Sequence, residues 1–486
     1  MKFTHCLCLC LCATLSLAAV AEGENTVRPN SSAPAPQLTF NKDIAPIVFQ
    51  NCTTCHRPGE VAPFTLGSYE DVSRRARQIV RVTEDRYMPP WKAEPGHGEF
   101  HDTRRLSDKQ IAALRQWVEQ GAVEGNASDL PPAPKFTDGW TLGPPDLVLK
   151  MPEAYTVPAD GRDVYRCFVL PIPIDEDKFV TAIDFRPSNR KVVHHAILFL
   201  DANGAARKKD EQDPGPGYHS FAGPGILPTG GLGGWAPGAF PRHLPDGVGK
   251  PVKKGSDLVL QLHLHPSGKP EEEQSTVGLY FSKKRPEKSV FVVPLRSRDI
   301  DIPAGEKAYK VSSRFTTPID LQAVGITPHA HYICKEMKGS ATLPDGTKKP
   351  LIWIRDWDFN WQEQYLYASP LKLPKGTQLE MEFTYDNSAE NIRNPSDPPR
   401  RVHWGEQTAD EMAILFIQAV AENPAELSKL KTALLQDTVS SLFRGKRWDG
   451  LKNAAKQFDK DGDGMLNEDE QAAALKAFKE RFAKKE

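Results

Sequence analysis

Five histidines of this chain, in three groups, have the spacing of transition-metal ligands. His194 and His195 are adjacent within an apolar run, His263 ends a second run, and His329 and His331 flank one alanine. Residues two apart on a strand share a face, so the last pair presents two imidazoles to one ion; an adjacent pair does so only at a bulge or a strand end. A single strand histidine is as often structural, but three groups indicate metal. Imidazole ligands favour zinc or copper, and an added thioether favours Cu(I).

A second group of reactive residues runs from Cys52 to His56 in the order Cys-Thr-Thr-Cys-His. This spacing is typical of c-type haem attachment, in which Cys52 and Cys55 form thioether bonds and His56 binds the iron. Met88, which two prolines follow, is the expected sixth ligand, because a thioether raises the haem potential and suits electron transfer. The alternatives are a redox-active cysteine pair, which belongs beside a βαβ unit, and half of a zinc site, which needs further Cys or His ligands nearby.

The C-terminal region contains a third pattern, an EF-hand loop over residues 459–470. Gly464 occupies the sharp-turn position of this loop, and oxygen ligands are available at every ligating position. A solvated acidic turn is the alternative. A single loop, rather than the usual pair, favours a structural clip over a sensor. The predicted Ca²⁺ ligands are Asp459, Asp461, Asp463, Met465 through its carbonyl, Asn467 and Glu470.

The composition narrows the class of protein. The 486 residues are enough for several domains, 39% of them are hydrophobic, and 62 basic residues nearly cancel 63 acidic ones. A formal charge of −1 provides no field for binding nucleic acid or an anionic membrane surface. The 42 prolines and 35 glycines predict many turns, as in β-sandwich proteins.

The first 21 residues have the pattern of a secretory signal peptide. Lys2 supplies the positive start, an apolar run extends from Cys6 to Leu17, and Ala19-Val20-Ala21 is a small-residue cleavage site. The run is too short to cross a bilayer comfortably, so no membrane span is expected after cleavage. The mature protein is therefore predicted to be exported, to the periplasm or the extracellular space.

The elements that must position these residues follow from local patterns. Residues 40–125 are predicted to be mainly helical, with a last helix that begins at a Ser107–Gln110 capping box and ends at Gly121. Residues 143–422 consist of short β-type runs separated by turn residues, which at this length predict two antiparallel sandwiches in series. These runs include 179–185, 192–200, 258–264, 289–293 and 379–385. The expected division is a signal peptide at 1–21, a linker at 22–39, a helical domain at 40–125, a linker at 126–142, sandwiches at 143–288 and 289–422, and a helical segment with the EF-hand loop at 423–486.

Cys167 and Cys334 are the two cysteines outside both the signal peptide and the haem motif. A disulfide framework needs more cysteines than these, so each domain must be held by its own core. The pair is compatible with one bridge in an oxidising compartment or with two buried free thiols, and the sequence leaves both open.

Two parts of the chain resemble known families. Residues 40–122 resemble a class I cytochrome c domain, through the Cys52–His56 motif, Met88-Pro89-Pro90 and a closing helix with Trp117. Residues 143–420 resemble the copper type II, ascorbate-dependent monooxygenases, which are the peptidylglycine α-hydroxylating and dopamine β-hydroxylating enzymes. The second resemblance is carried, in order, by Tyr165-Arg166-Cys167, His194-His195, Trp235 with Leu244–Gly249, Leu260–His263, His329-Ala330-His331 and Thr408–Met412.

The monooxygenase resemblance implies two jelly-roll-like sandwiches with one copper each. His194, His195 and His263 would bind the electron-storing copper of the first sandwich. His329, His331 and Met412 would bind the oxygen-activating copper of the second and so form the catalytic set. Each copper would supply one electron across a solvent-filled gap, and dioxygen would be converted to a hydroxylated substrate carbon and water.

Several positions depart from the pattern of this family. The peptide-amidating members hold a substrate carboxylate with an arginine two residues before the His-x-His pair, and Thr327 stands there in this chain. They also use Asn and Tyr after the methionine, where this chain has Ile414 and Phe416. A peptide C-terminus is therefore not the expected substrate, and a more apolar pocket is predicted. Cys167 matches a half-cystine of the family, but its usual partner region at 274–279 has no cysteine, and His265 is a spare histidine near the first site.

The function predicted from these observations is that of an exported copper-dependent monooxygenase. It would hydroxylate a C–H bond of a small, fairly apolar substrate with O₂, using two coppers, one covalent c-type haem and one Ca²⁺. Electrons would come from ascorbate or a redox protein and pass through the haem. The alternatives are a non-catalytic haem and copper protein for electron transfer or copper handling, and a calcium-dependent binding module.

Overall fold

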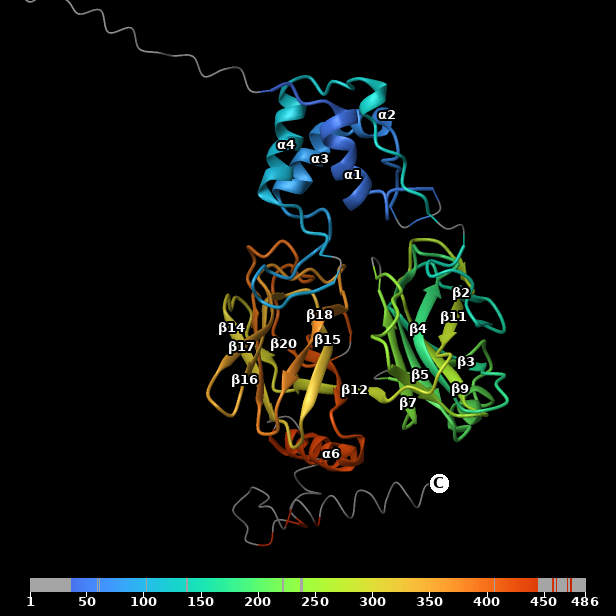
Figure 1. Cartoon of the computed structure of the whole chain (residues 1–486). Coiled ribbons are helices and arrows are strands. Elements are labelled where there is room, and N and C mark those ends of the chain that lie inside the picture. Colours follow the sequence, from blue (N-terminus) through green and yellow to red (C-terminus); the bar gives the residue numbers. More distant parts are fainter. Residues whose placement is uncertain are drawn as a thin grey trace, which may run out of the picture.

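The structure of this protein, a computed structural model, describes residues 36–444 except 59, 61, 102, 137–138, 221–222, 237–238 and 406, and also residues 457, 458, 460, 470 and 473. Most of this part of the chain forms β-strands in several sheets, and helices are few (Figure 1). A predominantly β protein, as the strand patterns predicted, is therefore confirmed. The predicted signal peptide and the EF-hand ligands other than Glu470 lie outside the described residues.

The N-terminal described segment is helical and has its own core. The helices are η1 (Phe40–Ile44), α1 (Ala45–Asn51), α2 (Tyr69–Ser73), α3 (Ala76–Glu84) and α4 (Asp108–Glu119), followed by the short turn η2 (Ala127–Asp129). Phe40, Ile44 and Trp117 are buried together between η1 and α4. The predicted capping box is confirmed, because the Gln110 N–H donates to Ser107 Oγ and the Ser107 N–H donates to Gln110 Oε1 at 2.8 Å.

The stretch between α3 and α4 leaves this helical segment and packs on a β-sandwich instead. Trp91 and Ala93 are buried in the core of that sandwich. The Glu94 N–H donates to the carbonyl oxygen of Trp353 at 2.8 Å, and the His101 N–H donates to that of Leu366 at 2.9 Å. The predicted helical domain at 40–125 is therefore interrupted, and its residues 91–101 belong structurally to the second sandwich.

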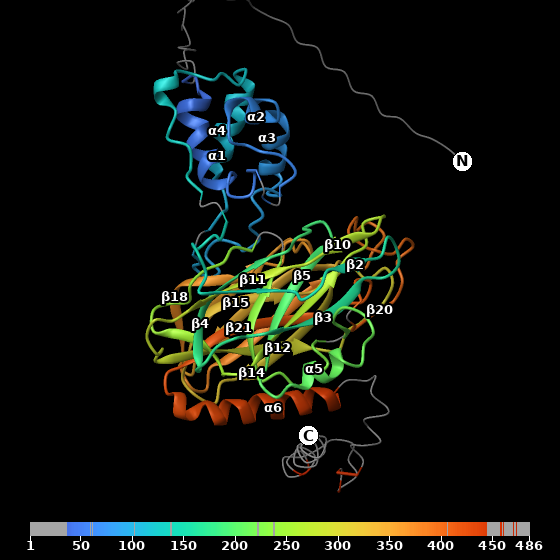
Figure 2. The same cartoon turned by 90° about the vertical axis from the view of Figure 1, so that its right-hand side faces the viewer.

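The first sandwich encloses a core between a four-stranded and a five-stranded layer (Figures 1 and 2). The first layer contains β1 (Leu147–Lys150), β11 (Thr276–Phe281), β4 (Lys178–Arg186) and β8 (Val248–Val252). The second layer contains β6 (Tyr218–His219), β3 (Val164–Pro171), β9 (Asp257–Leu264), β5 (Val193–Asp201) and β7 (Gly230–Trp235). A ribbon of β2 (Tyr155–Val157) and β10 (Glu271–Glu273) and the short helix α5 (Ala205–Asp210) complete this half.

The second sandwich has two four-stranded layers around a larger core. One layer contains β12 (Lys288–Ser297), β21 (Ala413–Ala421), β15 (Leu321–His329) and β18 (Tyr365–Leu373). The other contains β14 (Tyr309–Thr316), β19 (Gln378–Tyr385), β16 (Cys334–Thr342) and β17 (Lys348–Ile354). A short ribbon pairs β13 (Asp301–Ile302) with β20 (Val402–His403). The turn η3 (Pro424–Glu426) and α6 (Leu427–Arg444) follow, and Leu430 of α6 packs into the core.

The two sandwiches share one continuous sheet. β12 pairs in parallel with β8 through Lys288–Val248 and Ser289–Gly249, which joins the two layers into an eight-stranded sheet. The boundary expected between residues 288 and 289 thus falls within β12, which is itself the connection. This pairing restrains how the two halves sit relative to each other.

Every β-type run named from the sequence coincides with a strand. The runs 179–185, 192–200, 258–264, 289–293 and 379–385 correspond to β4, β5, β9, β12 and β19. The helical pattern predicted from Pro424 onward is present up to Arg444, as η3 and α6, and nearly all of its remainder lies outside the described residues. Among the described residues, no helix combines the length and apolar composition that a bilayer crossing needs.

Candidate metal centres

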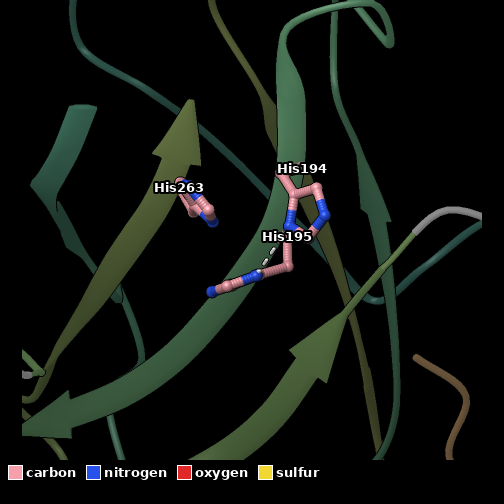
Figure 3. Close-up of side chains that lie close together, drawn as sticks. All are labelled: His194, His195 and His263. Atoms are coloured by element: carbon pink, nitrogen blue, oxygen red, sulfur yellow. Dashed lines mark hydrogen bonds between the residues drawn. The ribbon is translucent and has the colours of Figure 1, made fainter. Parts of the chain in front are cut away.

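The first histidine group converges where β5 and β9 pair (Figure 3). Val193 faces Leu264 and His195 faces His263, so the register shifts by one residue at His194. Such a bulge turns a side chain that would otherwise point to the opposite face. The ligand atoms of His194, His195 and His263 lie within 4.8 Å of one another as a result. The sequence predicted that two adjacent histidines could bind one ion only at a bulge or a strand end, and the structure has such a bulge at His194.

Hydrogen bonds indicate which nitrogen of each imidazole is available in this first group. His194 Nδ1 and His195 Nδ1 are hydrogen-bonded to each other at 3.2 Å, and His194 Nε2 is buried without a hydrogen-bond partner. His263 Nε2 lies 2.9 Å from Asp163 Oδ2, while its Nδ1 is buried without a hydrogen-bond partner. Two imidazole nitrogens bound to one ion at about 2.0–2.1 Å lie at most about 4.2 Å apart. The first pair already satisfies this limit, and His263 needs only a small inward movement to join it.

Asp163 is the acceptor that orients the first group. It contacts His263 Nε2 and, at 2.7 Å through its other oxygen, His265 Nδ1. The Thr408 hydroxyl, from the second sandwich, also donates to Asp163. Burial alone would raise the pKa of Asp163, but hydrogen bonds from His263 and Thr408 hold it well below its usual value. Asp163 is therefore an anion that fixes the His263 ring and links the two sandwiches.

The second group lies at the end of β15 and the start of β21. His329 Nε2 is 3.3 Å from Met412 Sδ, and His329 Nδ1 is 2.6 Å from Gln362 Oε1. His331 Nδ1 is 3.0 Å from the carbonyl oxygen of Asp410, which leaves its Nε2 for a ligand. An acceptor on the second ring nitrogen fixes the tautomer and orientation of a metal-binding imidazole. His329, His331 and Met412 are thus brought together as two Nε2 atoms and one thioether sulfur.

Glu411 holds the backbone on both sides of this second group. Its carboxylate accepts the N–H groups of His331 and Ile333 at 2.8 Å, Met412 at 3.1 Å and Cys334 at 3.2 Å. Its side chain is fully buried. Burial raises the pKa of Glu411 to about 8, against the effect of these four donors. One side chain thereby fixes the loop after β15 relative to the residue before β21.

The two groups touch each other across the sandwiches. The rings of His195 and His329 meet edge to face with centroids 6.4 Å apart. Phe359 stacks on His194 at 4.4 Å and meets the His331 ring edge-on at 5.6 Å. The structure therefore differs from the expected solvent-filled gap, because histidine and phenylalanine rings occupy the junction where the two groups face each other.

Burial keeps four of these imidazoles in the neutral, ligating form. It lowers the pKa of His194 and of His331 to about 3, with a further contribution from neighbouring histidines. It also lowers the pKa values of His195 and His329. Neutral imidazole is the form that binds a metal ion.

The Cys52–His56 motif follows directly on α1, with both thiols free and half-buried. Burial, reinforced by the neighbouring Cys55, raises the pKa of Cys52 to about 12, and burial also raises that of Cys55. The redox-pair and zinc alternatives stay open, since a bound metal ion would itself deprotonate the thiols. His56 Nδ1 lies 3.0 Å from the carbonyl oxygen of Phe64, so its Nε2 is left for an axial bond.

The structure also describes Met88, the cysteines Cys167 and Cys334, and one predicted Ca²⁺ ligand, Glu470. Met88 is half-buried in the turn after α3, where its N–H donates to the Val82 carbonyl oxygen at 2.9 Å, and its role as sixth ligand stays a prediction. Cys167 and Cys334 are both free, each buried in a different core, so the structure has two buried thiols and no bridge between them. Of the predicted Ca²⁺ ligands only Glu470 is described, and it accepts the Lys460 N–H at 2.6 Å.

The positions that depart from the monooxygenase pattern lie beside the second group. Thr327 is two residues before His329 on β15 and accepts a hydrogen bond from Gln418 Nε2 at 2.9 Å. Ile414 pairs with His329 and Phe416 pairs with Thr327 across β21, and both apolar side chains are half-buried. The surface next to His329 is therefore apolar at Ile414 and Phe416, while the position of the carboxylate-binding arginine carries the uncharged Thr327 hydroxyl.

Sequence reasoning missed the residues that support the ligands. Asp163, Gln362 and Glu411 lie far from their partner histidines in the sequence, except that Glu411 precedes Met412. Acidic and amide residues are common on any surface, so their types gave no signal. Only the adjacency of Glu411 to a candidate ligand could have drawn attention to it.

No protein-family model matches the chain. Among solved structures, the chain is similar to the major capsid protein P2 of bacteriophage PM2, with 10% identity, 57% of this chain and 97% of that chain covered, and a TM-score of 0.24. It is also similar to the VP2 subviral particle of infectious bursal disease virus, with 9% identity, coverage of 72% and 96%, and a TM-score of 0.16. A two-domain protein of unknown function from Bacteroides fragilis has 9% identity, coverage of 53% and 85%, and a TM-score of 0.15. Likenesses this weak support no conclusion about fold or function.

Proposed function

We propose that this protein is an exported, copper-dependent monooxygenase of the type II, ascorbate-dependent kind, with an N-terminal cytochrome c domain and an EF-hand Ca²⁺ clip. His194, His195 and His263 would hold one copper in the first of two jelly-roll-like sandwiches. His329, His331 and Met412 would hold the second copper, at which a C–H bond of a small apolar substrate is hydroxylated with O₂. The electron donor would be ascorbate or a redox protein acting through the haem.

One observation carries this proposal: two different donor sets face each other across the sandwiches. The first set is three imidazoles with a buried, unpartnered Nδ1 on His263. The second is two imidazoles and a thioether, with His329 Nε2 already 3.3 Å from Met412 Sδ. A soft sulfur ligand suits Cu(I), whereas an all-imidazole set suits either copper oxidation state. When bound, the two coppers would supply the electrons and the dioxygen chemistry of the reaction.

The protein itself would position the ligands and shape the substrate surface. Asp163 keeps the His263 ring oriented, and the Asp410 carbonyl and Gln362 do the same for His331 and His329. Phe359, buried between the two groups, keeps water from the histidine rings that it covers. Ile414 and Phe416 offer apolar contacts beside His329, which favours an apolar substrate over a carboxylate.

The haem would be held by Cys52, Cys55 and His56. The free thiols next to each other in the sequence motif and the His56 ring held by the Phe64 carbonyl oxygen both fit this role. Burial in an apolar environment and a histidine axial ligand are among the features by which a protein sets a haem potential. The helical segment would thereby serve the sandwiches as an attached electron carrier.

The close contact of the two groups favours a second candidate, a non-catalytic haem and copper protein for electron transfer or copper handling. With the His195 and His329 rings 6.4 Å apart, a substrate must enter beside the junction rather than through it. Oxygen consumption separates the two functions. A monooxygenase consumes O₂ in proportion to an added substrate that it hydroxylates, and a carrier does not.

The first experiment is a measurement of metal and haem content on the full chain, matured in a haem-attaching periplasm and loaded with copper. Elemental analysis and the pyridine haemochrome spectrum should give two coppers and one covalent haem. The variants His263→Ala and Met412→Leu should each lose one copper or its tight binding. EPR of the Cu(II) form should then show which signal disappears in each variant.

Matched controls lie close to the proposed ligands. His265→Ala removes an exposed histidine that also contacts Asp163, and Met381→Leu replaces a buried methionine in the core of the second sandwich. Both controls should keep two coppers. Zinc in place of copper, or a copper loss in the controls equal to that in the ligand variants, would contradict the proposal.

A further inference from the structure

The proposed haem domain is joined to the second sandwich through packed protein. The chain leaves the turn that contains Met88 and enters the second core at Trp91, whose ring meets Tyr365 edge-on with centroids 5.1 Å apart. Ala93 forms a β-bridge with Ile354, and Phe100 forms one with Tyr367. This connection is short, continuous and anchored on both sides.

From Trp91, a chain of close contacts leads to the second metal group. The Arg104 guanidinium carbon lies 5.6 Å from the centroid of the Trp91 ring. Arg104 Nη2 forms a 2.6 Å ion pair with Glu363 Oε1, and both side chains are largely buried. Gln362 is covalently next to Glu363, and its Oε1 lies 2.6 Å from His329 Nδ1. The four residues Trp91, Arg104, Glu363 and Gln362 are called the Trp91–Gln362 chain below.

The contact between the helical segment and the first sandwich is different. A cavity of about 290 Å³ lies between them, with Thr54 and Cys55 on one side and Trp235 and Phe240 on the other. A 3.6 Å ion pair between Glu60 and Arg190, which also line the cavity, joins the two parts. Trp235 faces Ala196 across the β5–β7 ladder, next to His195, so this cavity lies on the other direct approach to a metal group. The Glu60–Arg190 ion pair is a longer contact than the 2.6 Å contacts of the Trp91–Gln362 chain, which end on the His329 ring itself.

We infer that electrons pass from the haem domain directly to the second metal group through the Trp91–Gln362 chain, without first visiting the His194–His195–His263 group. One electron leaves ferrous haem, which becomes ferric, and reduces Cu(II) at His329, His331 and Met412 to Cu(I). No bond is made or broken along the chain, and no proton needs to move. This inference rests on the proposed function, because it presupposes both the haem and the second copper.

The test follows haem oxidation in a protein with only the second copper. The full-length His263→Ala variant, loaded with haem and one Cu(II), is photoreduced by a flash-excited flavin under anaerobic conditions. The ferrous haem band in the visible spectrum should decay as the Cu(II) EPR signal of the second site disappears in equal amount. A His194→Ala background provides the same test if His263→Ala does not fold.

Variants along and beside the chain identify the route. Trp91→Leu and Gln362→Leu should slow the decay of ferrous haem several-fold, and Trp91→Phe, which keeps an aromatic ring, should restore most of the rate. Trp235→Leu, on the cavity side, should leave the rate unchanged. Copper content, the EPR spectrum and the haem potential are measured for each variant, since loss of a merely structural contact would alter these rather than the rate alone.

Two outcomes would overturn the inference. In the first, ferrous haem persists in both one-copper backgrounds although the second Cu(II) is present, so that electrons must enter through the first group. In the second, Trp235→Leu slows the decay and Trp91→Leu does not. Failure of the proposed function itself has a different signature, namely that the unmodified chain binds no haem or no copper at the second site.

Discussion

In the first sandwich, three imidazoles converge from two neighbouring strands and depend on one outside carboxylate, Asp163, for orientation. In the second, two imidazoles and a thioether come from a strand end and from the residue before another strand. There, each ring has its own acceptor and the buried Glu411 holds the backbone. The first group is therefore organised by sheet pairing, and the second by a network of side chains. The second should be the more rigid group, and the one more easily destroyed by a single substitution.

The largest effect is expected from Glu411→Ala. Four backbone N–H groups would lose their acceptor in a fully buried place, and each unsatisfied donor destabilises the fold. We expect the free energy of unfolding to fall by at least about 3 kcal/mol, as urea denaturation would measure. Copper at the second site should be lost while copper at the first is kept. Glu422→Ala, an exposed control, should change neither, and loss of copper from the first site alone would reverse the comparison.

Asp163→Asn tests the dependence of the first group on one acceptor. The substitution removes the negative charge and replaces one acceptor oxygen by a donor, so the His263 ring loses its fixed orientation. Copper affinity at the first site should fall by about 10- to 100-fold, the usual effect of losing such a partner, with the second site little changed. Competition with a chelator would measure it. Thr408→Val removes only the hydrogen bond to Asp163 from the second sandwich. If this variant loses as much copper affinity at the first site as Asp163→Asn, the effect comes from the contact between the sandwiches and not from the orientation of His263.

Lys250, in the first sandwich, allows a test of stability against pH that does not involve the histidines. Burial lowers the pKa of Lys250, in β8 of the first sandwich, from 10.5 to about 8, and its Nζ donates to the Leu232 carbonyl oxygen at 2.5 Å. Between pH 8 and 10.5 the unfolded chain binds more protons at this position than the folded protein, so the contribution of Lys250 to stability rises with pH in that window. Below pH 8 Lys250 is charged in both the folded and the unfolded protein, and burial of its ammonium group destabilises the fold by the full amount.

Lys250→Met should remove this dependence and stabilise the protein at pH 7 by about 2 kcal/mol. Urea denaturation at a series of pH values would show it. Lys253→Met, an exposed lysine near the end of the same strand, is the control. If the free energy of unfolding rises with pH between 8 and 10.5 equally in Lys250→Met and in the unmodified protein, then the Lys250 side chain reaches water and its pKa is not lowered.

The smallest effect concerns the junction of the two groups. Phe359→Leu removes the ring that contacts His194 and His331 but keeps an apolar side chain in its place. We expect a loss of stability of about 1 kcal/mol, together with small changes in the Cu(II) EPR spectra of both sites. A change in one spectrum only would show that the junction belongs to that sandwich and that the two groups are independent.

Much of this arrangement could be predicted from the chain itself. The alternating runs gave the positions of β4, β5, β9, β12 and β19, because a half-buried strand requires a residue pattern of period two. The Ser107–Gln110 pair located the start of α4, since its capping interactions are local. The spacing of the histidines identified the metal-ligand candidates, and the bulge that their adjacency demanded is present at His194. Each of these features depends on residues that are near one another in the sequence.

Only the tertiary structure decided the rest, because it depends on contacts between distant segments. Asp163 meets His263 across 100 positions and Thr408 across 245, and no local pattern encodes either contact. The same holds for Trp91, which lies within the predicted helical domain but is buried in the second sandwich, and for β12, which joins the two halves. The sequence by itself indicated which residues are candidates for binding metals and haem. The folded chain decided which of their atoms are free, what holds them, and that the two metal groups touch, since these follow from packing across the whole molecule.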